Sequence, residues 1–221
     1  MQKNIVFFGP PGCGKGTQAA LLKGPLSLHH VSTGAILRHE VQQKTVLGMK
    51  IKENMDKGLF PPEPLVLETL TAYLAHQSLD SGFIFDGFPR TVSQAEWFDR
   101  FLSTKGQTIQ CVIYFAIQEE ILTKRLSGRF TCAVCGATYN EYFKKPHHEG
   151  VCDACGSHEF TRRTDDAVER VAERLRIYRD QTMPLLPFYQ KKGLLREIDV
   201  TKPMAEVSNE ILAAVVSSGK T

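Results

Sequence analysis

A glycine-rich segment near the N-terminus constrains the fold of this 221-residue chain more than any other feature. The apolar residues 5–8 (IVFF) lead directly into GPPGCGK, which ends at Lys15 and matches the pattern GxxxxGK. Glycines let backbone N–H groups turn inward around an anion, and the dipole of a following helix adds to the attraction. The segment therefore predicts a strand, a phosphate-binding loop and a helix, with Lys15 supplying a positive charge to nucleotide phosphates.

The alternative for this segment is a strand–helix turn without a ligand, which neither the lysine nor the preceding strand favours. The common pattern has Ser or Thr directly after the lysine, whereas here Gly16 comes before Thr17. We expect Cys13 to be a small side chain that fits the loop. The residues expected to hold the nucleotide here are Gly9, Gly12, Cys13, Gly14, Lys15, Gly16 and Thr17.

Short apolar runs alternate with helical patterns along almost the whole chain, which is typical of an α/β fold with a parallel sheet flanked by helices. With 42% hydrophobic and 23% charged residues, the chain can bury a sizeable core. The predicted strands are 5–8, 82–86, 111–116 and 194–198, with a further short strand before Thr33. Helices are predicted to begin at Lys15, Gly34, Pro64, Gln94, Gln118, Ala167 and Met204.

Two segments interrupt this alternation and predict insertions at the carboxyl end of the sheet, where open α/β folds bind ligands. Residues 32–61 hold two helical patterns without a clear strand between them, and residues 128–166 hold four cysteines with no long helical period. The predicted core domain then comprises residues 1–31, 62–127 and 167–221.

The bulk properties favour a soluble cytoplasmic protein. The formal charge of +3 is too small for a general polyanion binder. The N-terminus lacks the pattern of a signal peptide, and no apolar run approaches the length of a membrane span. We therefore expect no membrane and no nucleic acid among the partners.

Paired CxxC units indicate a metal site in the second insertion. Cys132 and Cys135 form one unit, Cys152 and Cys155 form the other, and sixteen residues separate them. This lies within the spacing of about 15–20 residues that is typical of zinc sites. Four thiolates give a closed tetrahedral site, hence a structural Zn²⁺, with Fe²⁺ or Co²⁺ as possible substitutes. Redox disulfides and unmetallated thiols remain the alternatives.

Four motifs in order carry a resemblance to a known family. These are GPPGCGKGTQ, STGAILR, FIFDGFPRT and RRTDD, and with the cysteine units they span essentially the whole chain. The series closely resembles the adenylate kinases, of the long bacterial type whose lid insertion carries four metal-binding cysteines. The resemblance implies a P-loop NTPase-type core, a small helical insertion at 32–61 that binds the nucleoside monophosphate, and a zinc-binding lid at 128–166.

The resemblance also implies residue roles. The implied catalytic residues are Lys15, Asp86, Arg90, Arg129, Arg163 and Arg174. The implied acceptor contacts are Thr33, Arg38, Gly87, Arg90, Gln94, Arg163 and Arg174, and the implied donor contacts beyond the loop are Arg125, Arg129 and Lys202. A shift of one position would exchange Arg162 for Arg163.

General chemistry supports these roles. Arginine forks suit the spread negative charge of a transferring phosphoryl group. Asp86, at the end of an apolar strand, is in a position typical of an acid that holds Mg²⁺ through water. Arg125 and Arg129 are spaced i,i+4, so we expect them to share one face of a helix.

Two departures from the family pattern stand out. Ala35 replaces the usual aspartate after STG, and GLFPPEP (58–64) replaces Gly-x-Leu-Val-Pro-Asp-Glu. Pro61 and Pro62 cannot donate backbone hydrogen bonds to an acceptor base.

The predicted reaction is the reversible, Mg²⁺-dependent transfer of a phosphoryl group from ATP to AMP, giving two ADP, by a monomer. Another nucleoside monophosphate kinase, with a different acceptor base or GTP as donor, remains open. A P-loop regulator that uses its cysteines to bind nucleic acid or a partner is an alternative of another class.

Overall fold

The computed structural model describes residues 3–56, 59–77 and 82–218, and within these residues five strands form a parallel sheet in the order β2-β3-β1-β4-β8. The strands are β1 (Asn4–Phe8), β2 (His29–Ser32), β3 (Phe83–Asp86), β4 (Ile109–Ala116) and β8 (Leu195–Asp199). β1 occupies the centre, so the loop that follows it opens at the middle of the carboxyl edge, where parallel sheets bind ligands.

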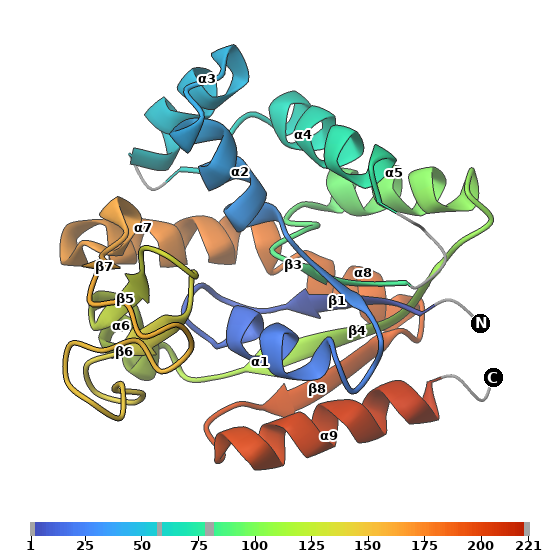
Figure 1. Ribbon diagram of the computed structural model, residues 1–221. Coiled ribbons are helices and arrows are strands. Elements are labelled where there is room, and N and C mark those ends of the chain that lie inside the picture. The colour runs from blue at the N-terminus through green and yellow to red at the C-terminus, as the bar shows by residue number, and fades with distance from the viewer. Residues whose placement is uncertain (1–2, 57–58, 78–81, 219–221) are drawn as a thin grey trace.

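Side chains on β1 alternate between two apolar cores, one on each face of the sheet. Ile5 and Phe7 belong to a core that α1 (Lys15–Leu22), α6 (Glu119–Ser127), α7 (Val168–Ile177) and α9 (Met204–Ser217) help to build. Val6 and Phe8 belong to the other core, with α4 (Glu63–Ala75), α5 (Val92–Ser103) and α8 (Leu185–Lys191). Figure 1 shows α1 and α9 on one side of the sheet and α4 and α5 on the other. The strand is thus buried on both faces, as its unbroken apolar run predicts.

The predicted fold class is confirmed: a central parallel sheet flanked by helices, with the glycine loop between β1 and α1. The short strand predicted before Thr33 is β2. The sequence interpretation did not identify α8 or the π-helical turn Tyr178–Thr182 that precedes it. Met183 and Pro184 separate these two short elements, so no helical period runs long enough there to be recognised.

Two helices follow β2 and form a hairpin, α2 (Thr33–Gln42) and α3 (Val46–Asp56). Gly48 permits their close approach, since a Cβ atom at this position would lie 2.1 Å from the carbonyl oxygen of Glu40. Of the motif at 58–64, Gly58 lies outside the described residues.

A second, antiparallel sheet of three strands lies within the described part of the other insertion, in the order β6-β5-β7. Its strands are β5 (Arg129–Cys132), β6 (Thr138–Asn140) and β7 (Phe160–Thr161). Cys132, Tyr139 and Cys152 form its small core, against which Phe130 and Phe160 pack. Figure 1 shows this sheet and the α2–α3 hairpin at the same end of the molecule, away from both chain termini.

Among the helices that the structure describes, none is both long and apolar enough to cross a membrane.

Candidate functional site

The glycine loop between β1 and α1 has the backbone conformation that an anion site needs. Gly12 and Gly14 adopt positive φ angles of 84° and 102°, and Gly14 is the N-cap of α1. Lys15 Nζ donates to the carbonyl oxygens of Gly9 and Pro10 at 2.8 and 2.9 Å, so its ammonium lies over the loop. The side chain of Cys13 is buried in the core beneath, which leaves its backbone as the part available to a phosphate.

Asp86 ends β3 beside this loop, and its contacts keep it charged. Its Oδ2 lies 3.4 Å from His30 Nε2. Burial alone would raise the pKa of Asp86, but His30, Lys15 and Arg90 together hold it below the ordinary value. A Cβ at position 16 would lie 3.3 Å from Asp86 Oδ2, which gives a steric reason for Gly16 directly after the lysine. The carboxylate is therefore an oxygen ligand of the kind that Mg²⁺ prefers.

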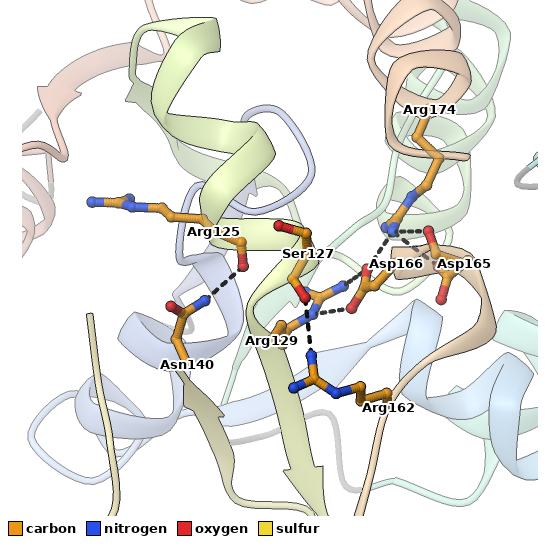
Figure 2. A network of polar contacts seen from close by, with 8 residues as sticks. All are labelled: Arg125, Ser127, Arg129, Asn140, Arg162, Asp165, Asp166 and Arg174. Carbon is orange, nitrogen blue, oxygen red and sulfur yellow. Dashed lines mark hydrogen bonds and ion pairs between the residues drawn. The ribbon is translucent and has the colours of Figure 1, made fainter. Parts of the chain in front are cut away.

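A cluster of arginines, held by two acids, lies between the lid sheet and α7 (Figure 2). Asp166 is buried, with 3% of its side chain exposed, and accepts from Arg129 Nε and Nη2, both at 2.6 Å. Arg174 Nη1 donates to the other side of the same carboxylate at 2.6 Å and lies 3.2 Å from Asp165 Oδ2. The two acids thus orient both guanidinium groups.

Three further arginines extend this cluster and leave it rich in positive charge. Burial and the neighbouring Arg129 and Arg38 lower the pKa of Arg163 to about 9. Burial and Arg174 lower the pKa of Arg90 to about 10. Burial also lowers the pKa of Arg38, against the attraction of Asp165. These groups remain cations at neutral pH but repel one another, and a phosphate bound among them would relieve that repulsion.

The predicted acceptor residues line an adjoining pocket. Arg90 Nε donates to the Gly87 carbonyl oxygen, and Gln94 Oε1 accepts from the Arg90 backbone N–H, both at 2.8 Å. Thr33 begins α2, and its buried hydroxyl has no hydrogen-bond partner among the described residues. The pocket measures ≈ 360 Å³ and is lined by Leu59, Phe60, Pro61, Glu63, Thr91, Gln94, Arg176, Ile177 and Gln181.

The prediction that Arg125 and Arg129 share a helix face is wrong. Helix α6 ends at Ser127 and Arg129 begins β5, so the i,i+4 rule does not apply. Arg125 donates instead to the carbonyl oxygens of Cys13 and Val200, at 3.4 and 3.1 Å. Figure 2 shows the two side chains pointing apart. Arg125 therefore lies beside the glycine loop, and Arg129 lies in the arginine cluster.

The structure also distinguishes two neighbours that the sequence interpretation could exchange. Arg163 lies in the arginine cluster, whereas Arg162 is exposed, donates to the Ser127 carbonyl oxygen at 3.0 Å and pairs with Glu141. Lys202 directs its ammonium to Glu210 and Glu206. Only the backbone of Lys202 is then left to face a ligand.

The four cysteines of the CxxC units come together. Their Sγ atoms all lie within 4.8 Å of one another, with 3.6 Å between Cys132 and Cys155 and 3.5 Å between Cys135 and Cys152. A tetrahedral zinc with Zn–S bonds of about 2.3 Å requires S–S separations of about 3.8 Å, close to those found. Each unit turns through a following glycine of positive φ, Gly136 at 75° and Gly156 at 73°. The residues present fit a structural metal ion.

Two acids of the site, Asp165 and Asp166, were not assigned a role from the sequence. The signal was present in the motif RRTDD, which places two carboxylates directly after the lid arginines. A buried acid at the centre of an arginine cluster requires knowledge of the fold, because Arg129 and Arg174 come from different elements. His30, which lies against Asp86, was likewise missed.

A parallel sheet with a glycine-rich phosphate loop after its central strand, an adjacent acid and a cluster of arginines defines a P-loop nucleotide phosphotransferase. The family model for adenylate kinase matches residues 7–194. The chain is 43% identical to the adenylate kinase of Zymomonas mobilis over 98% of its length and 97% of the relative. It is 44% identical to that of Carboxydothermus hydrogenoformans, with 96% and 98% covered, and 43% identical to that of Clostridium tetani, with 94% and 96% covered. The chain belongs to the adenylate kinase family.

Proposed function

We propose that this chain catalyses the reversible transfer of the γ-phosphoryl group of Mg²⁺-ATP to AMP, giving two ADP. Family membership supports the reaction, and the observation that carries it here is the arginine cluster beside the phosphate loop. Lys15 and Arg90 both act on the charge of Asp86, so the loop and the cluster belong to one electrostatic site.

The chemistry follows from charge. An oxygen of the AMP phosphate attacks the γ-phosphorus while the bond to the β-phosphate oxygen breaks, and the nucleophile is already anionic, so no strong general base is needed. The transferring group spreads negative charge over its oxygens. Lys15, Arg90, Arg129, Arg163 and Arg174 stabilise that charge, and their orientation before substrate binds lowers the cost of reorganisation.

The remaining residues divide between the two substrates. The glycine loop, Arg125 and the backbone at Lys202 hold the donor. The acceptor contacts are Thr33, Arg38, Gly87, Arg90 and Gln94. Gln94 Oε1 is engaged by the Arg90 backbone, which leaves its amide nitrogen to donate to a ring nitrogen of adenine.

Two metals complete the proposal. Mg²⁺ would bridge phosphate oxygens and be held, through water, by Asp86. Zn²⁺ would be held by the four cysteines, with no open position for chemistry, so its contribution is to the stability of the small sheet.

We propose the same division into domains as the motifs indicate: a core of 1–31, 62–127 and 167–221, an acceptor-binding insertion at 32–61 and a lid at 128–166. Closure of both insertions would exclude water from the reaction. Four metal-binding thiolates require a reducing compartment, which supports a cytoplasmic enzyme. We further propose that the enzyme is a monomer.

Initial rates of ADP formation with ATP as donor test the proposal, with AMP, GMP, CMP and UMP compared as acceptors. We expect AMP to be strongly preferred. A preference for another monophosphate would identify a different monophosphate kinase. Negligible transfer to all four, with salt-sensitive binding of nucleic acid, would favour a regulator instead.

A further inference from the structure

Arg90 is oriented by an aromatic ring that none of the roles above includes. Its guanidinium carbon lies 4.3 Å from the centroid of the Phe60 ring, within the range of a cation–π contact. On its other side, Arg90 Nε donates to the Gly87 carbonyl oxygen at 2.8 Å. The side chain is thus held between a ring face and a backbone acceptor.

This support differs from that of the other arginines. Arg129 and Arg174 are oriented by the carboxylate of Asp166, which also neutralises them. Within the part of the chain that the structure describes, no carboxylate forms an ion pair with Arg90. A ring face attracts a cation through its quadrupole without occupying the N–H donors that a phosphate would use. Arg90 can therefore bind an anion without first releasing an acid.

The segment that carries Phe60 is itself fixed. Pro61 and Pro62 restrict the backbone after the ring, and Pro62 is the N-cap of α4. Glu63 Oε2 accepts from Thr91 Oγ1 at 3.1 Å and from Ser93 Oγ at 2.7 Å, which joins this segment to the start of α5 next to Arg90. The departure from the family pattern at 60–63 is thus docked on the residues that follow Arg90.

We propose that Phe60 is a positioning residue that holds the guanidinium of Arg90 ready for the phosphate of the acceptor nucleotide. The inference rests on the proposed function, because it requires Arg90 to bind that phosphate. Burial and Arg174 lower the pKa of Arg90 to about 10, so the ring stabilises a cation that its surroundings otherwise disfavour.

Phe60→Leu, Phe60→Tyr and Phe188→Leu, each in the full-length protein, test this role. Leucine keeps an apolar side chain but removes the ring, and tyrosine restores the ring. Phe188 on α8 is a matched control, because Lys192 Nζ lies 4.5 Å from its ring centroid, in a contact of the same kind outside the site. The two probes are AMP and adenosine, which lacks the phosphate. Affinities are measured by calorimetry or by competition, and melting temperatures check the fold.

We expect Phe60→Leu to weaken AMP binding about fivefold, because a cation–π contact contributes about 1 kcal/mol. Adenosine binding is expected to stay unchanged, and Phe60→Tyr and Phe188→Leu are expected to bind AMP as the wild type does. In an Arg90→Ala background, Phe60→Leu should have no further effect on AMP affinity.

Equal losses for AMP and adenosine would overturn the inference, since Phe60 would then contact the base. Unchanged AMP affinity in a folded Phe60→Leu protein, or failure of tyrosine to restore it, would also overturn it. If the wild type prefers another monophosphate to AMP, the proposed function fails instead, and the acceptor assay on the wild type separates that result from this one.

Discussion

Strand β5 begins at an arginine of the proposed active site and ends at a cysteine of the metal site, and the two sites differ in how they are closed. Arg129 belongs to a cluster whose cations outnumber the acids that orient them, so an anionic ligand would stabilise it. Cys132 belongs to a set of four thiols that completes the coordination of one metal ion. One cluster is arranged for a substrate that comes and goes, and the other for a permanent metal ion.

This difference predicts that changes among the arginines alter catalysis and that changes among the cysteines alter stability. The largest effect is expected for Arg90→Ala. Because Arg90 stabilises charge on the transferring group, kcat should fall by about 10³ while the melting temperature stays close to that of the wild type. Steady-state kinetics and thermal unfolding of the same preparation check this. A near-normal kcat would remove Arg90 from the site.

Asp166→Asn is expected to affect both properties, because Asp166 is buried and neutralises two site arginines. Loss of its charge leaves Arg129 and Arg174 without their partner and should lower the free energy of unfolding by about 3 kcal/mol. Saturating nucleotide should recover part of this loss, since phosphate replaces the carboxylate. Denaturant unfolding with and without nucleotide measures it. An equal loss in both conditions would contradict the account of a site that needs anions.

A smaller effect separates two adjacent arginines. Arg163→Ala should lower kcat by about 10², because Arg163 lies in the cluster. Arg162→Ala serves as the matched control: its side chain is exposed and pairs with Glu141, so kcat should remain within about twofold of the wild type. Comparable losses for the two variants would mean that the cluster is assigned to the wrong residue.

The features predicted from the sequence were those that depend on local chemistry. The glycine loop, the apolar strands and the CxxC spacing each report on residues close in the chain, and the structure places them as predicted. The i,i+4 rule failed for Arg125 and Arg129 because Gly128 ends the helix between them. The carboxylate of Asp166 and the ring of Phe60 were missed because their partners are distant in the sequence or adjoin through packing alone.

The activity of metal-free protein at low temperature tests the central contrast most directly. The metal is removed with a chelator under reducing conditions, and kcat and the melting temperature are measured before and after removal and after Zn²⁺ is restored. We expect a large, reversible fall in melting temperature, with kcat at low temperature changed much less, because the four thiolates leave the metal no open position for chemistry. An unchanged melting temperature, or a kcat that falls as steeply as it does for Arg90→Ala, would contradict the account.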